Sequence, residues 1–306
     1  MQQKESRQEN YREKIQDIMS RQSSKKKLID RIMSAVAIVC VISALIPLAS
    51  ILIEVVKNGI SAISIEFLTQ PPGSFFLGHG GIAPAIQGTL IVVGLASLIG
   101  APVGVLAGIY LSEYAGNGIF PSMVRFFNDV LTGVPSIVMG IVGYVTIVLL
   151  LGSFSVLAGA LALSIIMIPI VVRVTEETFK IVPNSIREAA HSLGIPKWKI
   201  TLFITMKSAK NGILTGIVLA ISRITGETAP LIMTILGTSL FFTSFTGPID
   251  ALPLRIWRLA SQPYESAHSQ GWGAALVLIL IVLILSVVLR LLVQRKAGFK
   301  INRATF

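Results

Sequence analysis

The sequence predicts an all-α membrane protein that crosses the bilayer six times. The chain of 306 residues is 53% hydrophobic and only 13% charged, and its mean hydropathy is +0.78. Several apolar stretches reach the length of about 20 residues that a helix needs to span a bilayer. A water-soluble protein of this size needs a far larger polar surface, so soluble classes are excluded.

The predicted spans are apolar stretches separated by polar or turn-forming residues. They cover Ile32–Val56, Ile86–Tyr110, Val130–Leu151, Val156–Val172, Gly212–Gly237 and Trp272–Leu292. In the second span, Gly100, Gly104 and Gly108 recur every four residues and lie on one helix face. Small residues in this pattern let a neighbouring helix approach closely. We therefore expect a packing surface there, and another at Gly212 and Gly216 in the fifth span.

The distribution of Lys and Arg predicts the orientation in the membrane. Basic residues concentrate before the first span, between residues 173 and 211, and from Arg290 onward, whereas the opposite side carries only Lys57, Arg255 and Arg258. Because cytoplasmic segments carry the excess of basic residues, both termini are expected in the cytoplasm. The net charge of +11 is then a topology signal. Nucleic-acid binding is excluded, because no base-reading or stacking groups accompany the basic residues.

This topology divides the chain into a polar segment and one transmembrane domain. Residues 1–31 are too long for the charged region of a signal peptide, and we expect a helical cytoplasmic extension. Residues 32–306 form the transmembrane domain, with a cytoplasmic loop at 173–211 and an external loop at 238–271. The external loop is long enough to fold into short helices. Contact with an external partner and packing over the span ends fit its sequence equally well.

Two charged residues interrupt the fifth span. Arg223 and Glu227 are four residues apart, so on a continuous helix they lie on one face and can touch. A charge at mid-membrane depth costs about 3 kcal/mol, which pairing or an aqueous path lowers. The pair either locks the bundle or lines a transport path, and we favour the path because intramembrane charges usually mark one. Arginine suits a tetrahedral oxyanion through its planar fork, with the glutamate positioning it or acting as a gate.

Arg173 ends the predicted fourth span and is a further candidate. Its simplest role is to extend toward the lipid headgroups. If the fourth and fifth spans line one path, it becomes a second anion contact near the cytoplasmic exit. No metal site is predicted, because His79, His191 and His268 lie far apart and show no ligand spacing.

The cytoplasmic loop contains a short motif followed by a turn signal. Glu188-Ala189-Ala190 is followed by Gly194, which ends the helix and turns the chain. A second helix is predicted to start near Trp198. Helix, tight turn and helix together would form a rigid projection whose small alanines let a partner approach closely. An ordinary helical hairpin shows the same pattern.

This loop resembles the coupling motif of ABC-type import permeases, E-A-A-x3-G-x9-I-x-L-P. The match covers Glu188, Ala189, Ala190, Gly194 and Ile204. The motif's last two positions depart from the pattern, with Met206 and Lys207 where leucine and proline are expected. In that family the loop inserts into a groove on a cytoplasmic ATPase. The resemblance implies that the docking residues here are Glu188, Ala189, Ala190 and Gly194.

A longer stretch, from about Gly81 to the sixth span, resembles the A-type permease subunits of high-affinity phosphate importers. The similarity is carried by Gly81–Tyr114, Gly133–Val138 and Gly226–Leu231, the last reading Gly-Glu-Thr-Ala-Pro-Leu. The resemblance implies the type I ABC importer (MetI-like) permease fold in a bacterial cytoplasmic membrane. It also implies that Arg223 contributes to the phosphate path.

The same resemblance implies a set of partners within the lipid bilayer. These are a sister permease that completes a heterodimer, a dimer of ATP-binding subunits and an external phosphate-binding protein. The chain has no G-x-x-x-x-G-K-[ST] loop, so we expect ATP and Mg²⁺ to be bound by the ATPase. This subunit would then hold no cofactor and catalyse no reaction.

Three alternatives remain open. Sulfate, molybdate or a phosphonate fits a single arginine as well as phosphate does. A proton-coupled secondary transporter with Glu227 as its proton carrier is less consistent with the sequence, because it needs no ATPase-docking loop. In a membrane scaffold or sensor without transport, Arg223 and Glu227 would only lock the bundle.

Overall fold

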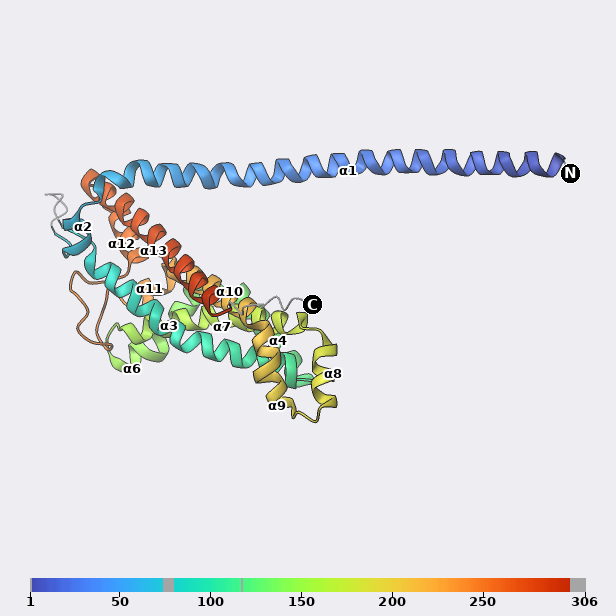
Figure 1. The fold of residues 1–306 in the computed structure, drawn as a ribbon. Coiled ribbons are helices and arrows are strands. Elements are labelled where there is room, and N and C mark those ends of the chain that lie inside the picture. The colour runs from blue at the N-terminus through green and yellow to red at the C-terminus, as the bar shows by residue number, and fades with distance from the viewer. Residues whose placement is uncertain (1, 74–79, 117, 298–306) are drawn as a thin grey trace, which may run out of the picture. The chain divides into compact units, whose positions relative to one another are not determined.

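The computed structural model describes residues 2–73, 80–116 and 118–297 (Figure 1). His79 and the end of the predicted transmembrane domain, residues 298–306, lie outside the described residues. The described chain folds into helices with two isolated β-bridges, Pro72↔Gly80 and Leu236↔Ile249, which confirms the all-α prediction.

Most elements follow one another closely along the chain, and a longer segment, 235–251, separates α11 from α12. The first half contains α1 (Gln2–Gly59), η1 (Ile60–Ala62), α2 (Ile65–Thr69), α3 (Ala83–Ile109), η2 (Tyr110–Tyr114), α4 (Ile119–Gly133), α5 (Ser136–Gly143), η3 (Tyr144–Val148) and α6 (Leu149–Leu151). The second half contains α7 (Val156–Ile181), α8 (Asn184–Ser192), α9 (Lys197–Lys199), η4 (Ile200–Thr205), α10 (Met206–Thr225), α11 (Ala229–Thr234), α12 (Leu252–Ala260) and α13 (Glu265–Ala297). Of the η elements, η2, η3 and η4 are π-helical.

The chain divides into two compact units, Met1–Glu54 and Val55–Phe306. The first unit lies within α1, so the N-terminal extension is helical as predicted. This helix continues without a break across residue 31. The second unit contains the other elements and all the sites described below.

Among the described residues, four helices are long and apolar enough to cross a membrane. They are Ile29–Ala62, Ala83–Tyr114, Val156–Ile181 and Glu265–Leu291. A bent pair, Ile119–Gly133 with Ser136–Leu151, makes a fifth if it counts as one span. The chain is therefore a multi-pass membrane protein, and it differs from the predicted set of six at the third and fifth spans.

The predicted third span, Val130–Leu151, is wrong as a continuous helix. Helix α4 already begins at Ile119, and the chain bends by 105° between α4 and α5. Pro135 lacks an amide hydrogen and disfavours helical geometry in the residue before it. Val134 accordingly adopts an extended conformation with ψ 134°. The apolar composition on both sides of Pro135 concealed this break.

The predicted fifth span, Gly212–Gly237, is also interrupted. Helix α10 begins earlier, at Met206, and ends at Thr225. The chain turns at residues 226–228 and resumes as α11, which has a proline in its first turn. A proline there is compatible with a new helix start, because its missing N–H has no partner in the first turn.

The glycine stripes produce the close helix contacts that the sequence predicts. Helices α3 and α10 both pack along α7 (Figure 1). A Cβ added at Gly104 would lie 2.7 Å from Val171 Cβ, and one at Gly108 would lie 2.6 Å from Thr175 Cβ. At Gly216 it would lie 2.3 Å from Val174 Cγ1. None of these positions has room for a side chain, so α3 and α10 both approach α7 closely.

The predicted external loop, 238–271, contains α12 and the beginning of α13. Helix α12 packs against α13 and α3, and its leucines Leu252, Leu254 and Leu259 are buried. The expected short helix is therefore present, and much of the loop packs over the helix ends.

A buried ion pair fixes the entry to α12. Arg255 donates from Nε to Asp250 Oδ2 at 2.7 Å, and both side chains are almost completely buried. Burial raises the pKa of Asp250, against the opposing effect of the Arg255 charge. Arg258 adds a hydrogen bond from Nη2 to the Leu236 carbonyl at 2.5 Å, which joins α12 to the segment after α11.

Candidate functional site

A pocket of about 240 Å³ lies where the bend between α4 and α5 meets the end of α10. Its walls come from α4, the bend, α5, α7, the end of α10 and the turn that follows it. The lining residues are Leu131, Thr132, Val134, Pro135, Ser136, Met139, Ile166, Ile170, Arg223 and Glu227. Irregular backbone at membrane depth is tolerated where it lines a cavity, and both helix interruptions occur at this one.

Arg223 and Glu227 lie together at this pocket, as the sequence predicts, but not on one continuous helix. The last residue of α10 is Thr225, so Glu227 lies in the turn that follows. Arg223 Nε and Glu227 Oε1 are 4.0 Å apart, and the side chains are 58% and 18% exposed. This separation is too long for a hydrogen bond. The guanidinium N–H groups therefore remain available to another acceptor.

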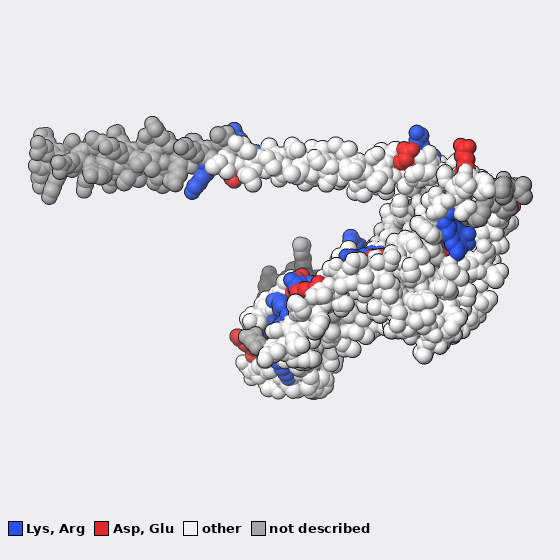
Figure 2. All heavy atoms as spheres, turned by 180° about the vertical axis from the view of Figure 1, so that it is seen from behind, with Lys and Arg blue, Asp and Glu red and all other residues white. Residues whose placement is uncertain are grey.

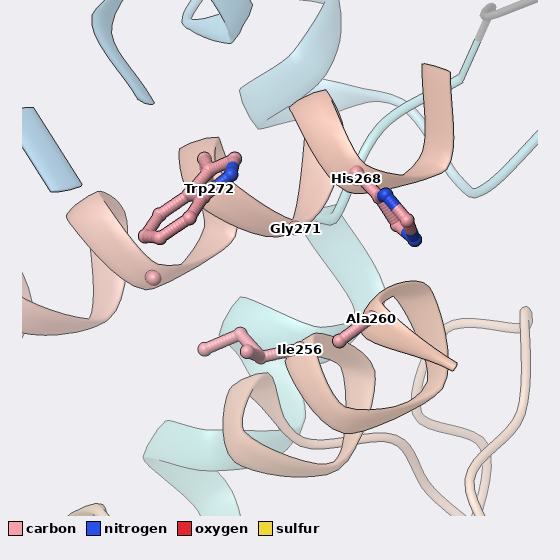
Figure 3. Close-up of a pocket in the computed structure, with 6 residues that line it drawn as sticks. Ile256, Ala260, His268, Gly271 and Trp272 are labelled. Atoms are coloured by element: carbon pink, nitrogen blue, oxygen red, sulfur yellow. The ribbon is translucent and has the colours of Figure 1, made fainter. Parts of the chain in front are cut away.

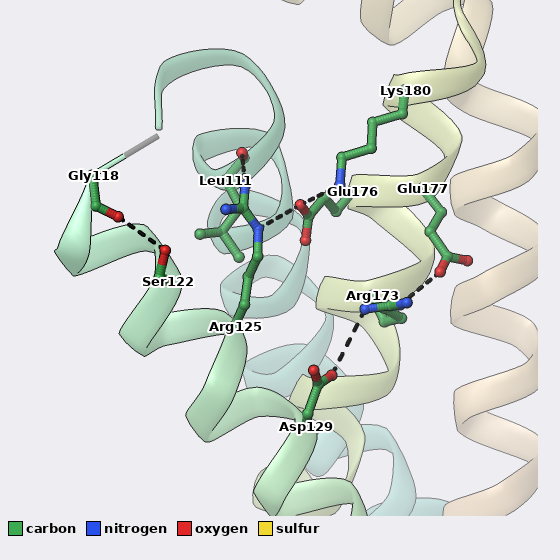
Figure 4. Close-up of polar contacts among 9 residues, drawn as sticks. All are labelled: Leu111, Gly118, Ser122, Arg125, Asp129, Arg173, Glu176, Glu177 and Lys180. Carbon is green, nitrogen blue, oxygen red and sulfur yellow. Dashed lines mark hydrogen bonds and ion pairs between the residues drawn. The ribbon is translucent and has the colours of Figure 1, made fainter. Parts of the chain in front are cut away.

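Arg173 does not line this pocket and is engaged with carboxylates. Helix α7 extends past the predicted span end at Val172 to Ile181, so Arg173 lies within a helix. Its Nε donates to Glu177 Oε1 at 2.6 Å, and Nη1 lies 3.7 Å from Asp129 Oδ1 on α4 (Figure 4). To contact a transported anion, the guanidinium would have to leave these exposed partners.

A more buried link between α4 and α7 was missed in the sequence. Arg125 on α4 donates from Nε to Glu176 Oε1 on α7 at 2.8 Å, and from Nη2 to the Leu111 carbonyl at 2.9 Å (Figure 4). Lys180 Nζ also contacts Glu176 Oε1, at 2.6 Å. The predicted start of the third span at Val130 placed Arg125 outside the predicted spans. Its position in the apolar segment 119–133 was the signal that could have found it.

The predicted helix, turn and helix of the loop at 173–211 are present. Helix α8 carries Glu188, and Gly194 turns the chain with φ +72°. The next helical segment begins at Lys197, close to the predicted start at Trp198. It continues through η4 into α10. Lys207 keeps the amide hydrogen that a proline would lack, which is compatible with this continuity.

The motif residues do not all face outward. Glu188, Ala189 and Gly194 are exposed, whereas Ala190 is only 5% exposed. Its small side chain thus belongs to the inner face of α8, and its carbonyl accepts a hydrogen bond from Ile195 N at 3.3 Å. Figure 2 shows Lys, Arg, Asp and Glu side chains gathered at the end of the second unit that carries this loop.

Another buried ion pair, also missed in the sequence, attaches α8 to η2, which follows α3. Arg187 Nη2 donates to Glu113 Oε1 on η2 at 2.8 Å, and the two side chains are 17% and 7% exposed. The same guanidinium donates to the carbonyls of Phe179 and Val182, each at 2.7 Å. Because these partners lie on η2 and at the end of α7, one side chain fastens α8 to both elements.

An apolar pocket of about 330 Å³ lies between α12 and α13. Its walls include Ile256, Ala260, His268, Gly271 and Trp272 (Figure 3). His268 Nε2 contacts the Gln262 carbonyl at 2.7 Å. Within the part of the chain that the structure describes, no group of three or more His, Cys, Asp or Glu side chains is placed to hold a metal ion.

Comparison with known sequences assigns the chain to a family. Residues 100–298 match the family described as binding-protein-dependent transport system inner membrane component. The phosphate transport system permease protein PstA of Yersinia pestis is 41% identical over 249 residues, 80% of this chain and 83% of that protein. PstA of Pasteurella multocida is 40% identical over 275 residues, 89% of this chain and 97% of that protein.

Solved structures show the same fold at low sequence identity. A chain of a bacterial alginate ABC transporter, in complex with an alginate-bound periplasmic protein, superposes with a TM-score of 0.64 at 16% identity, over 88% of this chain and 96% of that one. The MetNI methionine ABC transporter gives 0.58 at 15% identity, over 69% of this chain and 94% of that one. The predicted type I importer fold is therefore confirmed. The chain belongs to the PstA family of phosphate transport system permease proteins, within the binding-protein-dependent inner membrane components.

Proposed function

We propose that this protein is the permease subunit of an ATP-driven importer and forms, with a sister permease, the path for inorganic phosphate. The observation that carries the proposal is a loosely paired arginine at a pocket, in a chain about 40% identical to PstA proteins. A guanidinium matches the oxygens of phosphate through parallel hydrogen bonds.

The weakness of the Arg223–Glu227 pair suits transport. A transported ion must bind well enough to enter the site and weakly enough to leave it. Glu227 Oε1 lies 4.0 Å from Arg223 Nε. Its negative charge can compensate the positive charge of Arg223 after the anion departs. Glu227 is the less exposed of the two side chains, and we assign it the role of orienting the guanidinium.

The proposed complex contains a dimer of ATP-binding subunits and an external phosphate-binding protein. The loop around α8 docks on the ATPase in the cytoplasm, through the exposed Glu188, Ala189 and Gly194, and both chain termini lie on that side. ATP and Mg²⁺ are bound by the ATPase. Ala190 supports the docking surface from beneath, since it is buried in this chain.

Uptake of labelled phosphate tests the proposal. Cells that lack the gene are complemented with wild type, Arg223→Gln or Arg290→Gln, at matched membrane levels. Arg290 is an exposed arginine on α13 that does not line the pocket, so it controls for the loss of one positive charge. We expect wild type and Arg290→Gln to restore uptake. Arg223→Gln should reduce the uptake rate at least about tenfold, which corresponds to the free energy of one hydrogen bond to a charged group.

Parallel assays separate the alternatives. Sulfate or molybdate uptake in place of phosphate would identify another oxyanion. Loss of uptake with a protonophore while ATP is held constant would favour a proton-coupled transporter. Wild-type uptake by Arg223→Gln would show that the arginine is structural.

A further inference from the structure

Helix α4 connects the cytoplasmic end of the protein to the Arg223 pocket. Near its middle, Arg125 contacts Glu176 on α7 and the Leu111 carbonyl on η2. Glu176 is almost completely buried, with 4% of its side chain exposed. One guanidinium therefore joins three elements, and its main acceptor is removed from solvent (Figure 4).

The segment η2, which Arg125 contacts through the Leu111 carbonyl, also binds α8. Leu111 and Glu113 both lie on the five-residue η2, and Glu113 is the partner of Arg187 on α8. Arg187 also bonds the carbonyls at the end of α7. Consequently α8, η2 and the end of α7 form one connected body, and Arg125 ties α4 to two of its parts.

The other end of α4 forms a wall of the pocket. Leu131 and Thr132 of α4 line it, as do Val134, Pro135 and Ser136 of the bend. From Arg125 to the end of α4 at Gly133 the helix rises by about 12 Å. A helix of this length transmits displacement, because its backbone hydrogen bonds keep its two ends in register.

We propose that Arg125 and Glu176 are positioning residues that make α4 the element through which displacement of α8 reaches the anion pocket. This inference rests on the proposed transport function. When a docked partner moves α8, η2 and the end of α7 move with it through Arg187. The Arg125–Glu176 pair carries that displacement into α4, and the bend at Pro135 moves relative to Arg223 and Glu227.

The two other polar links between α4 and α7 are less suited to this role. Arg173 and Asp129 are 3.7 Å apart and more than half exposed. Asn128 donates from Nδ2 to the Pro169 carbonyl at 3.3 Å, without a charge on either side. Arg125 therefore makes the short, charged and largely buried link. This link resists separation because breaking it removes one of the two cations that compensate the buried Glu176 carboxylate.

The test compares phosphate transport with ATP hydrolysis in the complete transporter. The full complex, with the partner permease, the ATPase and the phosphate-binding protein, is reconstituted in proteoliposomes, and transported phosphate per ATP hydrolysed is measured. Three variants are compared with wild type: Arg125→Gln, Arg125→Gln/Glu176→Gln and Lys180→Gln. Lys180 contacts the same carboxylate from within α7, so its loss leaves the connection to α4 intact.

We expect Arg125→Gln to reduce phosphate transported per ATP by about 2- to 30-fold, the range found for substitutions along coupling networks. The double variant also removes the buried carboxylate that Arg125→Gln leaves with Lys180 as its cation, and so restores folding if charge burial is the only defect of the single variant. We expect it to remain as uncoupled as the single variant, while Lys180→Gln couples like wild type.

Two results would overturn the inference. Wild-type coupling in the double variant would show that the pair has only a structural role, and equal uncoupling by Lys180→Gln would show that the α4 link is not the cause. Failure of wild-type proteoliposomes to take up phosphate would instead contradict the proposed function. The two hypotheses are therefore tested separately.

Discussion

Two arginine–glutamate pairs in this protein have the same chemistry and opposite settings. Arg223 and Glu227 are four residues apart in sequence, 4.0 Å apart in space, and the arginine is 58% exposed. Arg187 and Glu113 come from distant parts of the chain, are 2.8 Å apart, and are 17% and 7% exposed. Arg187 makes further hydrogen bonds to two backbone carbonyls, which Arg223 does not share.

The difference distinguishes a held arginine, whose hydrogen-bond donors are occupied by buried partners, from an available arginine, whose donors can bind another acceptor. A short pair with buried partners fixes elements together, because its separation leaves charges without compensation. A long, exposed pair contributes little to stability, so its arginine can exchange partners at small cost. The same contrast supports Arg187 as an anchor of the loop around α8 and is consistent with Arg223 as the proposed anion contact.

The largest effect is expected on breaking the held pair. Arg187→Ala leaves Glu113 buried without its cation and releases two carbonyl contacts, so we expect a loss of about 3–5 kcal/mol in unfolding free energy. Arg223→Ala should cost no more than about 1 kcal/mol. Thermal unfolding of the purified protein in detergent measures both.

A control keeps the comparison interpretable. Glu113→Gln/Arg187→Gln removes both charges, and recovery of part of the lost stability would identify the unpaired carboxylate as the cause. Equal losses for Arg187→Ala and Arg223→Ala would contradict the division into held and available pairs.

The loop that Arg187 anchors also depends on one backbone conformation. Gly194 has φ +72°, and nothing lies within 4 Å of an added Cβ, so the cost of Gly194→Ala is purely conformational. A left-handed residue with a side chain costs about 1–2 kcal/mol, and we expect destabilisation of that size with reduced phosphate uptake.

Gly194→Asn is the matched variant, because asparagine adopts the left-handed conformation more readily than alanine. It should retain more stability and more uptake than Gly194→Ala in the same assays. The reverse order would mean that Gly194 is needed for its small size and not for its positive φ angle.

Much of the fold follows from local pattern. The apolar stretches identify α3, α7 and α13, and the glycine stripes predict which faces pack against α7. The two failures have a shared cause. Pro135 and Gly226 each lie between longer apolar segments, so the mean hydropathy over a span-length window stays high across a backbone break that depends on single residues.

In the candidate site, too, the sequence predicts the local features and not the long-range pairs. Arg223 with Glu227 and the motif around α8 are close in sequence, so spacing alone brings them together. Arg125 with Glu176 and Glu113 with Arg187 are separated by 51 and 74 positions. Their pairing depends on how α3, α4 and α7 pack, which no local pattern contains. Ala190 shows the limit within a motif, since its burial depends on the fold of the loop.

The smallest effect is expected at Arg173, whose pairs with Glu177 and Asp129 are exposed. Arg173→Gln should change the unfolding free energy by no more than about 1 kcal/mol. It should also reduce phosphate uptake far less than Arg223→Gln, because its guanidinium is already engaged by two carboxylates and lines no part of the pocket. Uptake kinetics at several phosphate concentrations, with Arg173→Lys as the charge-retaining control, measure this. If Arg173→Gln raised the KM for phosphate as much as Arg223→Gln does, at wild-type stability, Arg173 would lie in the path. Its guanidinium would then exchange Glu177 and Asp129 for the transported anion.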